Sequence, residues 1–137
     1  MEVDGPMDRV VIDLTGPHPT TGRQNRYILT CVDYFSRYLV ATSIRNKYAS
    51  TVAKALNWSL FCRWGLRREL LSNQGTEFDN KVLHELCAQF GIKKLRTSGC
   101  RPSANGRVER VHRTMNRILA KVIGDDHTSW DLSLIHI

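Results

Sequence analysis

A single carboxylate, Glu109, stands inside the most basic stretch of the chain and is the first candidate for metal chemistry. It is the only acidic residue between Lys93 and Lys121. Two interpretations fit this position. Glu109 could form an i,i+4 ion pair with Arg113 on a solvated helix. Alternatively, its carboxylate could hold a hard divalent cation, which prefers charged oxygen ligands. The choice between the two depends on residues far upstream.

The residues around Glu109 have the pattern of an amphipathic helix that follows a loop containing proline and glycine and ends near Ile123. The apolar positions share one side of this helix: Val108, Val111, Met115, Ile118, Leu119 and Val122. The basic positions share the opposite side: Arg107, Arg110, Arg113, Arg117 and Lys121. Spacing of three and four residues produces these two sides. We therefore expect one side to pack on a core and the other to face a polyanion.

Two earlier segments complete a pattern with Glu109. Asp13 ends the apolar run Val10-Val-Ile-Asp-Leu14, and Asn73 lies in Leu71-Ser-Asn-Gln-Gly-Thr-Glu-Phe78, with 35 residues between it and Glu109. Together with Asn105-Gly-Arg-Val-Glu-Arg110, these segments resemble the catalytic core of retroviral and retrotransposon integrases, especially those of Ty3/gypsy-type elements. The resemblance runs from about Val10 to Leu132.

The resemblance implies a catalytic site with one altered ligand. The family has two Asp and one Glu, with 35 residues between the last two, and these match Asp13, Asn73 and Glu109. It implies a DDE-type DNA strand transferase and endonuclease that uses two Mg²⁺ or Mn²⁺ ions. Asn73 offers a neutral carbonyl oxygen in place of a carboxylate. We therefore expect one of the two metal positions to be weakened and strand transfer to be severely reduced.

The same resemblance implies DNA contacts, both with element ends and with target DNA. Arg113, Asn116 and Arg117 match positions that face DNA in the family, and Asn105 matches a loop residue near the bound DNA end. Arg110 and Lys121 share the basic side of the helix. Such contacts go mainly to phosphates, so we expect affinity that falls steeply with salt and carries little base specificity. A merely solvated helix face is the alternative.

Composition restricts the class of protein. The 137 residues carry a net charge of +7, which favours an anionic partner, with the bases concentrated late in the chain. Its four cysteines show no zinc or disulfide spacing, and no apolar run is long enough to span a membrane. We expect neither a membrane nor a small-molecule substrate as partner. By resemblance, we expect an intracellular protein of the nucleus or element particle that forms a homo-oligomer when full length.

The alternation of apolar residues predicts an α/β domain in the order β-β-β-α-β-α-β-α. The expected strands are 9–14, 27–32, 37–44, 69–72 and 92–96. Three helices are expected. The first starts at Ser50 or Thr51 and ends at about Trp64, and the second starts at Asp79 or Asn80 and ends at Phe90. The third is the basic helix that contains Glu109 and ends near Ile123. This order matches the ribonuclease H-like fold that the family implies, a five-stranded mixed sheet with a three-strand antiparallel meander plus parallel strands, flanked by helices.

Two connections between these strands contain informative polar residues. The loop His18 to Asn25 is polar, and we expect it to be mobile. Asp33, like Asp13, ends a β-rich run, but an aspartate there commonly bonds the backbone amide two residues on. We therefore predict a turn role for Asp33 and a catalytic role for Asp13.

The ends of the chain differ from its centre. We interpret residues 1–8 as a leader or linker, residues 9–131 as the integrase core-like domain and residues 132–137 as a non-native tail. The last six residues resemble a translated transposon-end adaptor. On this interpretation the natural chain continues and the core is truncated at its C-terminus. The pair Trp130-Asp131 is expected to open a further helix.

A second functional class stays open. Besides Asn73, the loop Cys100-Arg-Pro102 departs from the Tyr-His-Pro that the family often has. The chain could therefore be a non-catalytic nucleic-acid-binding or protein-interaction module derived from an integrase. Asp at position 73 in related copies would favour the enzyme, and Asn there would favour the module. A cellular ribonuclease H shares the expected fold but not the residues around Asn73 and Glu109.

Overall fold

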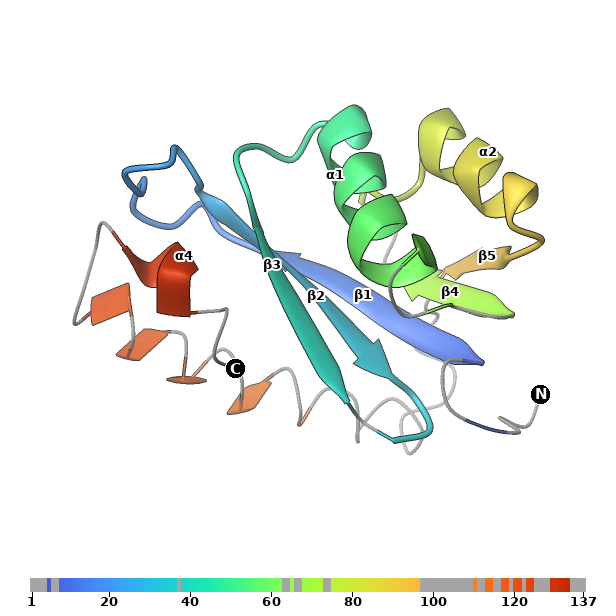
Figure 1. Ribbon diagram of the computed structural model, residues 1–137, viewed down its shortest axis with the longest axis horizontal. Helices are drawn as coiled ribbons and strands as arrows, with labels where there is room; N and C mark the ends of the chain where they lie inside the picture. The colour runs from blue at the N-terminus through green and yellow to red at the C-terminus, as the bar shows by residue number, and fades with distance from the viewer. Residues whose placement is uncertain are drawn as a thin grey trace.

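A five-stranded mixed sheet forms the centre of the structure (Figure 1). The computed structural model describes residues 5, 8–36, 38–62, 65, 68–72, 75–96, 110, 113–114, 117–118, 120–121, 123–124 and 129–133. Its elements, in chain order, are β1 (Arg9–Thr15), β2 (Tyr27–Asp33), β3 (Leu39–Ile44), α1 (Ala49–Leu56), η1 (Asn57–Cys62), β4 (Glu69–Ser72), α2 (Lys81–Gln89), β5 (Lys93–Arg96) and α4 (Trp130–Ser133).

The strands lie in the order β3-β2-β1-β4-β5. β2 pairs antiparallel with β1 and with β3, whereas β4 pairs parallel with β1 and β5. The predicted meander with two added parallel strands is therefore confirmed. Because β1, β3, β4 and β5 run in one direction, their carboxyl ends meet at one edge of the sheet, where open α/β sheets place their sites.

Alternating side chains give the sheet two different faces. On one face Ile12 of β1 and Leu29 of β2 belong to the main core, together with Leu56 of α1 and Leu83 of α2. On the other face Ile28 packs with Ile123 and Trp130. Figure 1 shows α1 and α2 on one side of the sheet, with α4 and the described residues 110–124 on the other. Asp13 alternates with Ile12, so its side chain belongs to the second face.

A buried ion pair holds β1 against β4 at their amino ends. Arg9 Nε lies 2.8 Å from Glu69 Oε2, and both side chains are largely buried. The guanidinium also lies over the Tyr34 ring, 5.2 Å from its centroid. These contacts agree with the pairing of Arg9 with Glu69 in the β1–β4 register. The register of the far ends, where the candidate site lies, follows from this pairing.

The helix predicted from Ser50 or Thr51 is divided in two. Its N-cap residue is Tyr48, without a side-chain cap bond, so the predicted Ser or Thr cap is wrong. The α-helical part ends at Leu56, and η1 continues as a π-helix. The Ser59 hydroxyl donates to the Ala55 carbonyl at 2.6 Å, the acceptor that an α-helix assigns to the Ser59 amide. Gly65, directly after the predicted helix end at Trp64, adopts a left-handed conformation at φ 69°.

The second predicted helix, α2, begins as expected. The Asn80 side chain accepts a hydrogen bond from the Leu83 amide at 2.9 Å, which makes Asn80 the N-cap. The Val82 side chain is exposed, because it lies about 100° around the helix from the buried Leu83. Phe90, also partly exposed, stacks on Phe61 with ring centroids 5.1 Å apart.

The described cysteines are free thiols: Cys31 and Cys87 are buried and Cys62 is exposed. Burial raises the pKa of Cys31 to about 12 and that of Cys87 to about 11, so both are poor nucleophiles. Cys100 lies outside the described residues. Of the helices that the structure describes, none has the length and apolar character needed to cross a membrane.

Candidate metal site and nucleic-acid interface

Asp13 lies near the carboxyl end of β1, in the middle of the sheet. It pairs with Thr30 of β2, whose hydroxyl donates to the Asp13 carbonyl at 3.2 Å. Its Oδ1 accepts a hydrogen bond from the Leu14 amide at 2.9 Å. Within the described part of the chain, no other group bonds to this half-buried carboxylate. Oδ2 is therefore available to an external ligand while the strands hold the backbone firmly.

The carboxyl end of β4 lies beside this part of β1. Val11 pairs with Leu71 in the parallel register, and the next residue, Ser72, is fully buried. The Lys94 ammonium of β5 contacts the Ser72 hydroxyl and donates to the Leu95 carbonyl at 3.1 Å. Asn73, the predicted second ligand, lies outside the described residues. The structure thus describes β4, the strand that leads to Asn73. The contact of the Lys94 ammonium with Ser72 has no signal in the sequence.

The turn after β4 is anchored in the core. Phe78 is fully buried, and its amide and that of Asp79 donate to the Gly75 carbonyl at 3.0 and 2.8 Å. The Glu77 carboxylate rests against Gly75, where a β-carbon would come within 2.7 Å of Glu77 Oε1. Any side chain at position 75 would therefore displace this acid.

Asp33 has the turn role predicted for it. Its carboxylate accepts hydrogen bonds from the Phe35 amide at 3.3 Å, the Ser36 amide at 3.3 Å and the Ser36 hydroxyl at 2.6 Å. It pairs with Val10 at the opposite end of β1 from Thr15. The two acids compared in the sequence therefore lie towards opposite ends of β1.

The described residues between 110 and 124 are helical, as predicted. Arg110, Arg113, Arg117 and Lys121 are all exposed, and steps of three and four residues keep them within one narrow arc. Ile123 is buried against Ile28 and Trp130 on the opposite side. The predicted DNA-facing residues Asn105 and Asn116, and the predicted ligand Glu109, lie outside the described residues.

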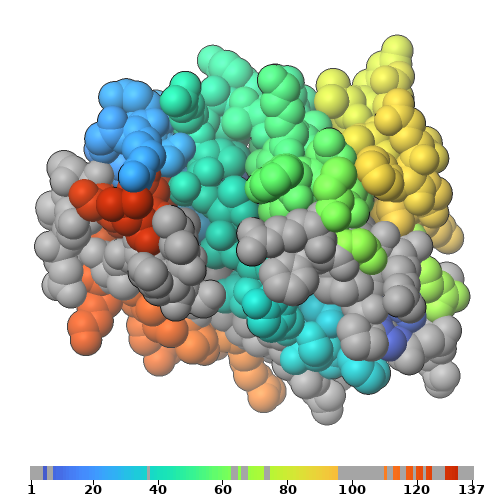
Figure 2. Space-filling model, in the orientation of Figure 1, coloured from blue at the N-terminus to red at the C-terminus, as the bar shows by residue number. Residues whose placement is uncertain are grey.

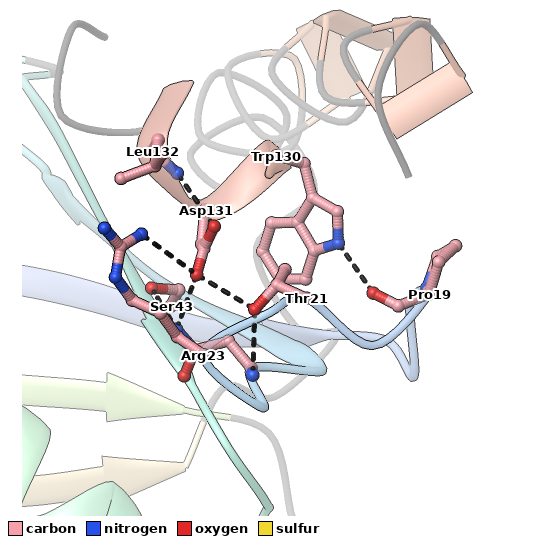
Figure 3. A network of polar contacts seen from close by, with 8 residues as sticks. Pro19, Thr21, Arg23, Ser43, Trp130, Asp131 and Leu132 are labelled. Carbon is pink, nitrogen blue, oxygen red and sulfur yellow. Dashed lines mark hydrogen bonds and ion pairs between the residues drawn. The ribbon is translucent and has the colours of Figure 1, made fainter. Parts of the chain in front are cut away.

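Sequence analysis missed a polar cluster that joins α4 to the loop after β1 (Figure 3). The Thr21 hydroxyl and the Asn25 side-chain amide both donate to Asp131 Oδ2 at 2.9 Å, and Arg23 lies 3.8 Å from the same oxygen. Asp131 is buried, and burial alone would raise its pKa. The hydrogen bonds from Asn25 and Thr21, with Arg23 and the Leu132 amide, instead lower the pKa of Asp131 below its ordinary value.

Trp130 contacts the same loop at Pro19 and His18. Its side chain is fully buried, and Nε1 donates to the Pro19 carbonyl at 2.7 Å. The His18 ring meets the indole edge-on, with centroids 5.6 Å apart, and its Nε2 lies 3.0 Å from Thr15 Oγ1. Partial burial lowers the pKa of His18. Figure 2 shows α4 directly against this loop, so the loop predicted to be mobile is tied down.

These contacts bear on two predictions about the C-terminal part. Trp130 and Asp131 do open a helix, as expected. The Trp130-Asp131 pair was the only sequence feature that pointed to this cluster. No nearby residue indicated that its partners lie in the loop after β1. The predicted boundary of a tail at residue 132 falls inside α4, and residues 134–137 lie outside the described part.

A divalent ion needs several oxygen ligands, and the described residues supply part of such a set. Asp13 contributes a carboxylate oxygen without a hydrogen-bond donor among the described residues, which suits a hard cation. In the described ranges, no three His, Cys, Asp or Glu side chains gather closely enough to hold an ion. The other two predicted ligands fall outside those ranges, so among the described residues the fit rests on Asp13.

Comparison with known proteins decides the family. The family described as "Integrase core domain" matches residues 3–102. The chain belongs to this integrase core family. The match includes Asp13 and Asn73, and Glu109 lies beyond it.

Relatives extend the similarity of this integrase core further along the chain. It is 38% identical over 127 residues to the retrovirus-related Pol polyprotein from transposon 412 of Drosophila melanogaster, covering 93% of this chain and 10% of that protein. It is 30% identical over 131 residues to gypsy retrotransposon integrase-like protein 1 of Pongo abelii, covering 96% of this chain and 25% of that protein. The chain therefore spans a quarter or less of the length of these relatives.

A solved structure supports the same conclusion about the fold. The catalytic core domain of BIV integrase superposes with a TM-score of 0.74 and 28% sequence identity, covering 93% of this chain and 78% of that one. The ribonuclease H-like arrangement predicted for the sheet and helices is confirmed. This integrase core is thus of the retrotransposon and retroviral type.

Proposed function

We propose that this integrase core acts on DNA by metal-dependent strand transfer, and that Asn73 impairs the reaction. The observation that carries the proposal is the position of Asp13, whose carboxylate has an oxygen without a described donor, beside the end of β4 that leads into Asn73. Mg²⁺ or Mn²⁺ held by Asp13, Glu109 and the amide oxygen of Asn73 would supply charge neutralisation and alignment for phosphodiester exchange.

The chain's own residues have distinct tasks in this proposal. Asp13 would supply one carboxylate, whose position is fixed because β1 pairs with β2 and β4. Arg110, Arg113, Arg117 and Lys121 bind DNA phosphates along the exposed side of the helix, independently of the metal ligands. This independence also supports the second candidate, a DNA-binding module without catalysis. We further propose action in the nucleus or element particle, on element ends and target DNA, as a homo-oligomer of the full-length protein.

The decisive experiment compares this chain with Asn73→Asp in Mn²⁺-dependent cleavage and rejoining of a branched DNA. Both proteins are first shown to be folded, and Asn73→Asp carrying Asp13→Asn is the control. We expect activity in Asn73→Asp, at least about 10-fold less in the parent, and none in the control, because the loss of a ligand's charge costs no less than that of an outer-shell partner.

Other outcomes would change the proposal in different ways. Equal activity of the parent and Asn73→Asp would contradict the impairment but keep the enzyme. Inactivity of both, together with salt-dependent DNA binding, would favour the non-catalytic module.

A further inference from the structure

A second group of cations lies away from the helix, at the edge of the sheet where β1 and β3 end. We call it the basic edge: Arg23, Arg26, Arg45 and Lys47, all exposed. Residues 16–30 and 39–48, which supply it, contain these four cations and no acidic residue. None of the carboxylates that the structure describes pairs with Arg26, Arg45 or Lys47. Apart from Arg23, which lies 3.8 Å from Asp131, the cations of this edge have no acidic partner within the described part of the chain.

Two of the arginines, Arg26 and Arg45, flank the last pair of the β2–β3 ladder. Tyr27 pairs with Ile44 at the end of that ladder, and the Arg26 amide donates to the Ile44 carbonyl at 3.0 Å. Arg26 directly precedes the pair on one strand, Arg45 directly follows it on the other, and both are exposed. The strand pairing therefore brings two cations to the same end of the ladder. Like charges brought to one place repel each other, and a bound polyanion relieves that repulsion.

The loop that carries two of the cations is held in one conformation. Within it, the Gln24 amide donates to the Thr21 carbonyl at 2.9 Å and the Asn25 amide to the Thr21 hydroxyl at 3.1 Å. Asn25 also donates to the Ser43 hydroxyl of β3 at 3.3 Å and to Asp131 of α4. Ordered cations lose little conformational freedom on binding, which favours affinity.

Arg23 keeps most of its charge available to a ligand. Its side chain is 61% exposed, and its guanidinium is 3.8 Å from Asp131 Oδ2. An exposed pair at this distance is weak. The buried Asp131 therefore orients Arg23 at the surface without neutralising the basic edge.

The basic edge adjoins the candidate site. β1, β3 and β4 all end at this edge of the sheet, and Asp13 precedes the end of β1 by two residues. Figure 2 shows the loop after β1 (blue) beside the β3–α1 connection (teal) at one end of the molecule. The helical cations lie on the segment packed under the second face of the sheet (Figure 1). The two basic surfaces are thus separate parts of the molecule.

We propose that the basic edge is a second phosphate-binding surface, which holds duplex DNA alongside the candidate site. This inference rests on the proposed DNA-directed function. Duplex DNA fits because its closely spaced phosphates match several exposed cations on neighbouring segments. Its contacts go to phosphates and carry no sequence preference.

The test measures binding of the 137-residue chain to a fluorescein-labelled duplex by anisotropy between about 50 and 200 mM salt. The test variant is Arg26→Gln with Arg45→Gln. The matched control is Lys81→Gln with Lys93→Gln, two exposed lysines outside the basic edge, which changes the net charge equally. Arg113→Gln with Arg117→Gln examines the helical surface separately. Thermal unfolding of every variant is recorded in parallel.

We expect the test variant to lower the slope of log affinity against log salt by about 1.8, two released phosphate contacts, with a smaller change in the control. Its melting temperature should stay close to that of the parent, because exposed side chains without a buried contact contribute little to stability. A slope equal to that of the control, or a lower melting temperature with unchanged DNA binding, overturns the proposal. If the parent and every variant fail to bind DNA, the proposed function fails too. If only the helical variant loses affinity, this proposal alone fails.

Discussion

Asp131 Oδ2 lies 2.9 Å from the Thr21 hydroxyl, although 110 positions separate the two residues in the chain. The contact joins α4 to the loop that follows β1, the strand of Asp13. A carboxylate that accepts several bonds in a buried position leaves costly unpaired donors when it is removed. The last described helix of the chain therefore stabilises the edge of the sheet where the candidate site lies.

Asp131→Ala is expected to lower the free energy of unfolding by about 1–3 kcal/mol, because the Thr21 and Asn25 donors lose their acceptor. Arg23→Gln removes only the exposed ion pair and should cost less than about 1 kcal/mol. Urea unfolding at neutral pH measures both. Equal losses in the two variants would show that the buried hydrogen bonds are unimportant.

Acid should abolish the contribution of the Asp131 charge. Its pKa is lowered in the folded protein, so its stabilisation is complete above the unfolded value of about 3.9 and disappears as pH falls through the folded value. Asp131→Asn keeps the shape of the side chain but cannot titrate. The difference in unfolding free energy between parent and Asp131→Asn should be largest near neutrality and shrink below about pH 3.9. A difference that persists at low pH would contradict this.

Two tryptophans provide a matched pair. Trp130 is fully buried and bonded to the Pro19 carbonyl, whereas Trp58 is 71% exposed. Trp130→Phe should lower the unfolding free energy by about 1–3 kcal/mol, since it leaves a cavity and an unpaired carbonyl. Trp58→Phe should change it by no more than about 0.5 kcal/mol. A larger loss at Trp58 would indicate that its ring is covered in solution.

Asp13 and Asp33 give a second matched pair. Asp13→Asn should reduce Mn²⁺ broadening of the Leu14 and Thr30 amide signals in NMR spectra, with an apparent affinity at least about 10-fold weaker. Asp33→Asn should leave that broadening intact. It should instead lower stability by about 0.5–1.5 kcal/mol, because an amide replaces an acceptor that holds Ser36. Broadening that survives Asp13→Asn would remove Asp13 from the metal site.

His18 is expected to destabilise the fold in mild acid. Burial lowers its pKa in the folded protein, so the unfolded chain takes up a proton first as pH falls below about 6.5. The free energy of unfolding should then decrease until folded His18 is also protonated. His18→Gln should lack this component, whereas His84→Gln on the exposed face of α2 should retain it. Identical pH profiles for His18→Gln and the parent would contradict the prediction.

Local patterns in the sequence determined the elements and several of their ends. Alternating apolar residues located the five strands, Asn80 was one of two predicted caps for α2, and the left-handed glycines Gly65 and Gly91 lie where helices were expected to stop. The turn role of Asp33 also followed from a local rule. Such features depend on residues within about one helical turn or one strand, so a single sequence contains them. Resemblance added the family and hence the fold.

Tertiary structure decided what depends on contacts between distant segments. Packing or strand register decides four features: the π-helical continuation of α1, the exposure of Val82, the Lys94 ammonium beside Ser72, and the position of Arg26 and Arg45 at one end of the β2–β3 ladder. The anchoring of the loop by Thr21, Asn25 and Trp130 contradicts the mobility expected from its polar composition. A hydrogen bond between residues more than 100 positions apart leaves no periodic signal in the sequence. A polar residue is therefore expected to be solvated unless the folded structure shows its buried partner.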